Sequence, residues 1–269
     1  MDKFYVITND SKDENFELTH SVKAYIEEKG KVCILADGSV VPEGIEGALA
    51  IGGDGTLIQA ARELLQYDIP VIGINMGTLG YLTEIEVQNV YSAIDSLIAG
   101  EHTVEERMLL CGEMPNGLSD VALNDIIVTR YGSLHLIELN VYVNGELLNS
   151  YQADGMIIST PTGSTAYNLS AGGPIVEPTA SLIVLTPICS HALNTSSIIL
   201  SVDDEISIEL GSRREGCEEE AVIAFDGTDI SRIHTGERIV IRKAKETTKL
   251  MKLNRISFLE TLRRKMKGN

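Results

Sequence analysis

The chain has 269 residues, 43% of them hydrophobic, and a formal net charge of −17 at pH 7. The length and apolar content predict a globular protein with one large domain or two ordinary ones. The excess of negative charge argues against nucleic acid or an anionic membrane as a partner, because both would repel it. No basic and apolar leader opens the chain and its four cysteines form no C-x-x-C pair, so we expect a soluble, cytoplasmic protein with reduced thiols.

The first hundred residues alternate short apolar runs with amphipathic helical patterns. Strands are predicted at 4–7, 32–35, 48–51 and 70–74, and helices at 18–26, 56–65 and 90–98. Strands that alternate with helices predict an α/β domain with a parallel sheet covered on both faces. In such sheets ligands bind at the carboxyl ends of the strands.

After about residue 100 the pattern becomes predominantly β. An alternating run ends at Asn144-Gly145, the preferred pair for a tight hairpin, and similar short runs recur to about residue 241. We therefore predict an α/β domain over residues 1–100 and a β-sandwich-like domain over residues 101–249. Ser257 and Glu260 form a capping-box pattern before a short helix, and residues 250–269 are expected to return to the first domain.

Gly52-Gly53-Asp54-Gly55-Thr56 stands between a predicted strand and a predicted helix. Glycines let the backbone approach an anion, and a helix start offers unpaired N–H groups, so the turn is a candidate phosphate site. Asp54 suits a proton acceptor for an attacking hydroxyl, or part of a metal site, which points to phosphoryl transfer. A purely structural Asp-Gly turn is about equally supported by this motif alone. The candidate phosphate contacts are Gly52, Gly53, Gly55 and Thr56.

A long segment from Asp154 to Pro174 is rich in hydroxyl groups and glycine. Such groups suit the hydroxyls and phosphates of a nucleotide in a chain this acidic, and a loop of this length favours a function over a plain connection. Asn124-Asp125 is either a hydrogen-bonding pair for sugar hydroxyls or an Asx turn. The histidines lack metal-ligand spacing, and only His135 is a candidate contact.

These motifs, in this order and at this spacing, resemble the NAD kinases, which phosphorylate the 2′-hydroxyl of the adenosine ribose of NAD. The resemblance covers nearly the whole chain, and residues 160–174 are its most specific part. The Gly-Gly-Asp-Gly-Thr motif alone is shared with lipid kinases and 6-phosphofructokinases. Two positions depart from the family pattern: Gln152, where a basic residue is often found, and Thr228, where Gln is often found.

The resemblance implies roles for individual residues. Asp54 would be the general base, and Gly55 would contact the dinucleotide. Asp154 would bind the nicotinamide side. The other implied contacts to NAD are Asn124, Asp125, His135 and Gln152, with an adenine and ribose loop made of Thr165, Ala166, Tyr167, Asn168, Leu169 and Ser170.

The donor implied is ATP or polyphosphate, whose charge must be neutralised. The sequence places little lysine near the motif, so Mg²⁺ bound with the donor is expected. The resemblance also suggests a homodimer or homotetramer. Two other functions stay open at this point: a lipid kinase of the same superfamily, which the net charge disfavours, and a non-catalytic sensor that binds NAD or NADP without consuming ATP.

Overall fold

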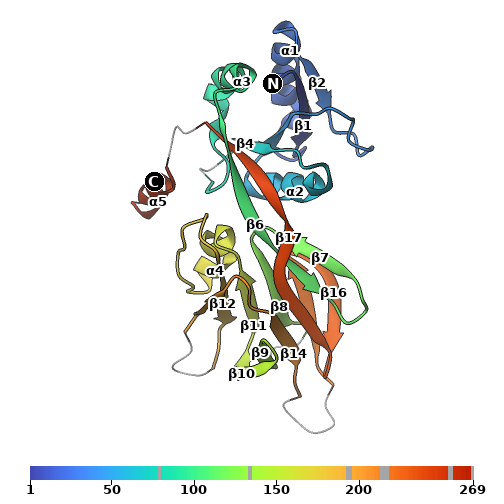
Figure 1. Ribbon diagram of the computed structural model, residues 1–269, viewed down its shortest axis with the longest axis vertical. Helices are drawn as coiled ribbons and strands as arrows, with labels where there is room; N and C mark the ends of the chain where they lie inside the picture. The colour runs from blue at the N-terminus through green and yellow to red at the C-terminus, as the bar shows by residue number, and fades with distance from the viewer. Residues whose placement is uncertain (78–79, 133–134, 192–195, 213–217, 254–256, 268–269) are drawn as a thin grey trace. The chain divides into compact units, whose positions relative to one another are not determined.

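The structure is a computed structural model in which the chain forms two compact units (Figure 1). The first unit contains Met1–Glu106 and Thr248–Asn269, and the second contains Arg107–Thr247. The structure describes all residues except 78–79, 133–134, 192–195, 213–217, 254–256 and 268–269.

A parallel sheet forms the centre of the first unit. Its strands are β1 (Lys3–Thr8), β2 (Val32–Leu35), β3 (Gly47–Gly52), β4 (Val71–Asn75) and the short β5 (Ile85–Glu86). The order is β2-β1-β3-β4, with every neighbouring pair parallel, and β5 pairs with β4. Every residue of β3 is buried, as expected for a central strand covered on both faces.

Helices cover both faces of this sheet. They are α1 (Glu17–Glu28), α2 (Asp54–Glu63) and α3 (Val90–Ala99). Side chains of α1 and α3, such as Val22 and Ile94, pack with one face of the strands, whereas Leu57 of α2 packs with the other. The predicted parallel α/β sheet is therefore confirmed. The helix α2 begins earlier than the hydrophobic pattern indicated, because Gly53 is extended and the next residue is already helical.

The second unit is built almost entirely from β-strands. They are β6 (Thr103–Glu113), which begins in the first unit, β7 (Ser119–Ala122), β8 (Asp125–Arg130), β9 (Ile137–Val143), β10 (Glu146–Ala153), β11 (Gly155–Ser159), β12 (Leu182–Ile188), β13 (Ile198–Ser201), β14 (Ile206–Leu210), β15 (Glu220–Phe225), β16 (Thr228–His234) and β17 (Arg238–Lys252). The hairpin between β9 and β10 turns at Asn144-Gly145, where both residues have positive φ, as their pairing predicted.

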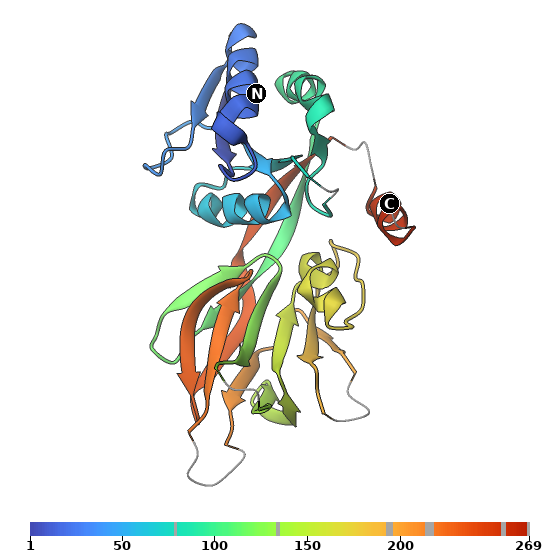
Figure 2. The ribbon, with the colours of Figure 1, turned by 180° about the vertical axis from the view of Figure 1, so that it is seen from behind.

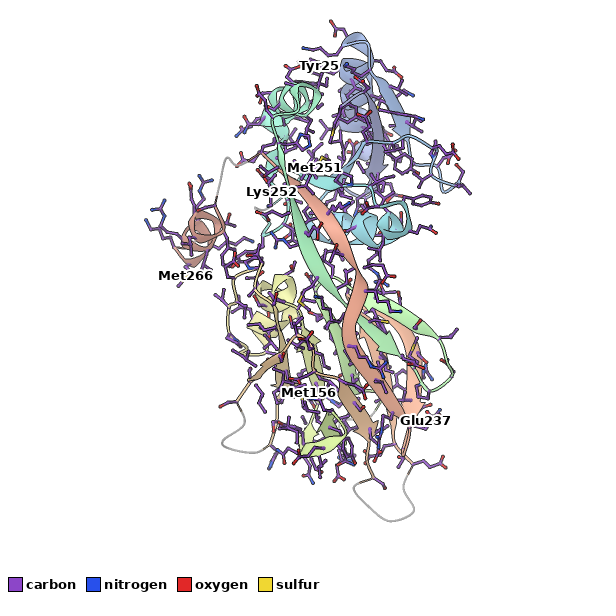
Figure 3. All side chains as sticks on the ribbon, in the orientation of Figure 1. Tyr25, Met156, Glu237, Met251, Lys252 and Met266 are labelled. Atoms are coloured by element: carbon purple, nitrogen blue, oxygen red, sulfur yellow. The ribbon has the colours of Figure 1, made fainter. Side chains whose placement is uncertain are left out.

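Two sheets enclose the core of the second unit. One has the antiparallel order β13-β12-β11-β8-β15-β16, and the other includes β10-β9-β14-β17. Inward-facing residues of both sheets form one buried cluster, which includes Leu139 of β9, Ile208 of β14 and Met156 of β11. Figure 3 labels Met156 within this core. The predicted β-sandwich-like domain is confirmed.

Helical turns interrupt the hydroxyl-rich segment that follows β11. A 3₁₀ turn, η4 (Thr162–Thr165), leads into a single helical turn, α4 (Tyr167–Ser170). Both lie beyond the end of β11, where Figure 2 shows them in yellow. The segment is thus a compact, partly helical structure, whereas the sequence indicated an irregular loop.

The last long strand, β17, takes part in both units. Ile241 pairs with Ile206 of β14 in the second unit, and Leu250 pairs with Val71 of β4 in the first. The C-terminal helix α5 (Phe258–Met266) begins at Ser257, whose side chain accepts a hydrogen bond from the N–H of Glu260, as the capping pattern predicted. None of its residues is buried. Among the described residues, no helix has the length and apolar character needed to span a membrane.

Candidate functional site

The turns that follow β1, β3 and β4 are hydrogen-bonded together at one edge of the parallel sheet. The N–H of Asn9 donates to the carbonyl of Ile51 at 2.9 Å, and its side-chain Nδ2 donates to Thr56 Oγ1 at 3.4 Å. The N–H of Met76 donates to the carbonyl of Gly52 at 2.7 Å. This is the edge at which parallel sheets bind ligands, and it contains the Gly-Gly-Asp-Gly-Thr turn.

The glycine turn leaves open space at the start of α2. A Cβ added at Gly55 would meet no atom within 4 Å, so a ligand has room to approach the unpaired N–H groups of the first helical turn. Thr56 is buried, and its hydroxyl already accepts from the N–H of Gly53 at 3.4 Å. Thr56 therefore supports the turn from inside, while Gly55 lies at the open side.

Asp54 is the first residue of α2, and its carboxylate holds the segment 81–83. Oδ2 accepts from the N–H of Tyr81 at 2.7 Å. Oδ1 accepts from the N–H of Leu82 at 3.2 Å, the N–H of Thr83 at 2.9 Å and the Thr83 hydroxyl at 3.0 Å. A carboxylate oxygen has two lone pairs, so Oδ1 is fully used and Oδ2 keeps capacity for one more proton donor. The neighbouring Thr78 and Leu79 lie outside the described residues.

In the second unit, Asn124 precedes β8 and Asp125 begins it, beside Asp226, which follows β15. Asp226 Oδ1 accepts from the N–H of Asn124 at 2.7 Å and of Asp125 at 3.3 Å. Oδ2 accepts from the N–H of Leu123 at 2.9 Å. In return, the N–H of Asp226 donates to the carbonyl of Asp125 at 3.0 Å. The Asx-turn alternative is therefore replaced by a longer-range arrangement in which one carboxylate holds three consecutive N–H groups.

Asp125 is almost completely buried, with 3% of its surface exposed. Burial, together with the negative charge of Asp226, raises the pKa of its carboxyl to about 7. The Oδ1 atom of Asn124 is also buried and has no hydrogen-bond partner among the described residues. A buried amide oxygen without a partner is uncommon in a folded protein and needs an explanation. A hydrogen-bond donor on a bound ligand would be such a partner.

The start of the hydroxyl-rich segment packs directly against Asn124. The N–H of Thr160 donates to the Asn124 carbonyl at 2.8 Å, and the Thr160 hydroxyl donates to the Leu123 carbonyl at 2.5 Å. A Cβ at Gly163 would overlap the Asn124 carbonyl, so only glycine permits this approach. The structure therefore brings the Asn124-Asp125 pair and the Asp154–Pro174 segment together, although many residues separate them in the chain.

Asn168 fixes the shape of the expected adenine and ribose loop. It is fully buried, and its Nδ2 donates to the carbonyls of Ser164 and Pro174, each at 3.0 Å. Its Oδ1 accepts from the Thr186 hydroxyl at 2.7 Å. All the polar atoms of this side chain are thus used within the protein. The neighbouring candidates that keep partly or largely exposed surface are Thr165, Ala166, Tyr167, Leu169 and Ser170.

The remaining predicted contacts are Asp154, which precedes β11, and the exposed residues Gln152 and His135. Asp154 Oδ1 accepts from Arg130 Nε at 2.7 Å, and the Asp154 carbonyl accepts from the Thr129 hydroxyl at 3.0 Å. Gln152 is an exposed residue of β10, and His135 is exposed just before β9. Within the described part of the chain, no three His, Cys, Asp or Glu side chains come close enough together to hold a metal ion.

Comparison with known proteins decides the family. Residues 8–102 match the model of the ATP-NAD kinase N-terminal domain, and residues 123–253 match that of the ATP-NAD kinase C-terminal domain. The chain is 48% identical to an NAD kinase from Agathobacter rectalis, covering 100% of this chain and 99% of the relative. It is 43% identical to an NAD kinase from Lachnospira eligens, covering 99% and 100%. The chain belongs to the NAD kinase family.

Solved structures in this family share the fold. Yeast NADH kinase complexed with NADH superposes with a TM-score of 0.89 at 21% identity, covering 100% of this chain and 88% of the yeast chain. An NAD kinase from Archaeoglobus fulgidus in complex with ATP gives 0.77 at 23% identity, covering 94% of each chain. At these identities the likeness concerns the fold alone.

Three residues beside the predicted contacts were not predicted from the sequence. Asp226 holds the Asn124-Asp125 pair, Arg130 is ion-paired with Asp154, and the ammonium group of Lys12 lies beside the glycine turn. The Asp226-Gly227 turn pair after an apolar strand was a visible signal for the first. Arg130 at the end of β8 and Lys12 in the turn after β1 are single basic residues, and the sequence around them does not reveal their partners.

Proposed function

We propose that this NAD kinase transfers the terminal phosphoryl group of ATP to the 2′-hydroxyl of the adenosine ribose of NAD, producing NADP and ADP. Family membership over the whole chain supports this reaction over the lipid kinase and sensor alternatives. The observation that carries the catalytic assignment is Asp54, whose Oδ2 accepts a single hydrogen bond from the described residues and so has a second lone pair for a proton at the ligand-binding edge of the sheet.

In the proposed step, Asp54 Oδ2 takes the proton of the ribose 2′-hydroxyl. The 2′-oxygen forms a bond to the γ-phosphorus while the bond from that phosphorus to the bridging oxygen of ADP breaks. Hydrogen bonds from Tyr81 and Thr83 fix the carboxylate in one orientation, which favours proton transfer in a defined geometry. The open side of the turn at Gly55 is the proposed place for phosphate.

Segments of the second unit are proposed to hold NAD. The unpartnered Asn124 Oδ1 is an acceptor for a hydroxyl or amino group of the dinucleotide. Asp125, with its pKa near 7, is able to donate a hydrogen bond when protonated and to accept one when ionised. The exposed residues of the loop 165–170, together with His135, Gln152 and Asp154, complete the proposed contacts.

Mg²⁺ is proposed to enter with the donor. This ion commonly keeps several waters and binds through substrate phosphates with one or two carboxylates, a mode that requires no cage of protein ligands. The described residues contain no cluster of three carboxylate, His or Cys ligands, and the Oδ2 of Asp54 is assigned to the ribose hydroxyl, so the donor phosphates and water would hold the ion. When bound, the ion would supply neutralisation of the negative charge on the transferring phosphates.

NADP formation tests the proposed reaction. Purified protein is incubated with NAD and Mg²⁺ and, in separate reactions, with ATP or with inorganic polyphosphate, and NADP is measured by an NADP-specific dehydrogenase. We expect NADP with ATP and none when NAD or donor is omitted. Absence of NADP with both donors, from protein that still binds NAD, would favour the sensor.

We also propose that the protein works in the cytoplasm as a homodimer or homotetramer. Free thiols at Cys33, Cys111 and Cys189 are compatible with a reducing compartment. Exposed apolar residues on the edge strands, Leu147 of β10 and Ile199 of β13, are compatible with contacts between subunits. Light scattering after gel filtration tests the assembly, and a monomeric mass would exclude it.

A further inference from the structure

Lys12 places a positive charge beside both glycine-containing turns of the phosphate edge. Its Nζ lies 2.7 Å from the position that a Cβ would occupy at Gly53, and 3.9 Å from the corresponding position at Gly77. These glycines follow β3 and β4, and Lys12 follows β1. The ammonium group therefore lies where the loops after three adjacent parallel strands come together, which is the part of the sheet edge that binds ligands.

The backbone of Lys12 is held by the same hydrogen bonds that organise this edge. Its N–H donates to the Asn9 carbonyl at 3.1 Å. Asn9 Oδ1 accepts from the N–H and the hydroxyl of Ser11, closing a tight Asx turn. Asn9 is in turn bonded to Ile51 and Thr56. The backbone of Lys12 is therefore held in place, and its side chain extends from there over the turn at Gly53.

Five other lysines of the first unit are neutralised by carboxylates, as expected in an acidic chain. These ion pairs join Lys23 to Glu27, Lys29 to Asp95, Lys31 to Asp2, Lys249 to Asp68 and Lys252 to Glu84. Among the described residues, Lys12 has no carboxylate oxygen within 4.0 Å of its Nζ. The adjacent Asp13 is engaged with the start of α1, where it accepts from the N–H groups of Leu18 and Thr19.

We propose that Lys12 binds the phosphate chain of the donor. A phosphate chain entering the open side of the turn would meet the N–H groups at the start of α2 and the Lys12 ammonium together. A chain with net charge −17 repels an anionic donor at long range, so a local cation is required at the point of binding. Lysine binds phosphate as a compact point charge and needs no planar, bidentate partner.

This inference rests on the proposed function and adds one residue to it. It also corrects the expectation that little lysine lies near the Gly-Gly-Asp-Gly-Thr turn, because the fold places Lys12 beside that turn although it is remote in sequence. Since NAD is assigned to the second unit, the interaction concerns the donor alone. Loss of Lys12 should therefore raise the KM for the donor and leave the affinity for NAD unchanged.

The test compares Lys12→Met with Lys12→Arg and with Lys23→Met, a matched control on the exposed side of α1. For Lys12→Met we expect a rise of roughly 10- to 100-fold in the KM for ATP, and for polyphosphate if the wild type uses it, because a charge-assisted hydrogen bond is lost. The dissociation constant for NAD and the melting temperature should match those of the wild type. Lys12→Arg should recover much of the loss, since it keeps the charge.

A second variant moves the same ammonium group without deleting it. A Cβ at Gly53 would lie 2.7 Å from Nζ, closer than two such atoms can approach, and the flexible end of the lysine would yield. The backbone of Gly53 is extended, so alanine fits there without strain, and Gly53→Ala should also raise the donor KM. An unchanged donor KM in Lys12→Met, or a change no larger than in Lys23→Met, would overturn the inference. If Lys12→Met fails to fold, Gly53→Ala decides the question, and an unchanged KM for the donor in that variant would overturn the inference.

Failure of the proposed function gives a different result. In that case the wild type makes no NADP with any donor, and the role of Lys12 is judged by calorimetric binding of adenosine 5′-(β,γ-imido)triphosphate with Mg²⁺. Weaker binding to Lys12→Met than to the wild type supports the phosphate contact. Equal binding, or no binding to the wild type, overturns it.

Discussion

Asp226 and Asn124 lie 102 positions apart in the chain, yet Asp226 Oδ1 accepts a hydrogen bond of 2.7 Å from the N–H of Asn124. Asp226 has a positive φ of 50°, and Gly227 follows with 80°, so the carboxylate is presented from a tight turn at the end of β15. This turn positions the backbone of the Asn124-Asp125 pair, and with it the two side chains that we assign to NAD.

Asp226→Asn should weaken NAD binding without a comparable loss of turnover. Asparagine keeps one acceptor, but its amide group would face N–H groups that now have no partner, and each unmade buried hydrogen bond costs about 1–3 kcal/mol. We expect the KM for NAD to rise roughly tenfold, as measured by steady-state kinetics. Asp203→Asn, an exposed change in the same unit, serves as the control. An unchanged KM for NAD would show that Asp226 does not position the pair.

Asp125 should make the stability of the protein depend on pH. Its folded-state pKa of about 7 exceeds the ordinary aspartate pKa of 3.8, so between these values the folded state binds a proton that the unfolded state has released. Stability therefore falls as pH rises from about 4 to about 7 and is level above that range. Asp125→Asn should remove this decline and raise the urea midpoint at pH 8, while weakening NAD binding. Equal midpoints for both proteins at pH 8 would contradict the buried acid.

Asp54→Asn should separate binding from chemistry. The amide oxygen of asparagine still accepts the hydrogen bonds from Thr83, but the amide group cannot take a proton from the substrate. General-base catalysis contributes roughly 10²–10⁴-fold to the rate. We expect turnover to fall by that factor while the dissociation constant for NAD, measured by calorimetry, changes little. Turnover near that of the wild type would remove Asp54 as the base and leave it only the role of holding the segment 81–83.

Gly55→Ala should fold well and work poorly. The added methyl group meets no protein atom within 4 Å, and replacing glycine by alanine inside a helix stabilises by roughly 0.5–1 kcal/mol. The same methyl group would occupy the space assigned to phosphate. Thermal melting should therefore show an unchanged or higher midpoint, with a clear loss of kcat/KM for the donor. Full activity in this variant would mean that the open side of the turn is not where the substrate binds.

The two domain types were predictable because local patterns decide them. Apolar runs alternating with amphipathic helices indicated the parallel sheet, and the period-two runs with Asn144-Gly145 indicated the antiparallel domain. The pattern was less informative where hydroxyls and glycines dominate. The turns η4 and α4 are stabilised by Asn168 and by contacts to the backbone of Asn124, which no local pattern reveals.

The sequence by itself determined the architecture, the family resemblance and the Gly-Gly-Asp-Gly-Thr turn, because hydrophobic periodicity and glycine geometry are local properties of the chain. Only the tertiary structure showed that Asp226 holds Asn124, that Arg130 pairs with Asp154, and that Lys12 lies over Gly53. These contacts join the ends of strands that are adjacent in a sheet but distant in sequence. These ion pairs and hydrogen bonds depend on distances between atoms in the folded protein, and the order of residues in the sequence does not specify those distances.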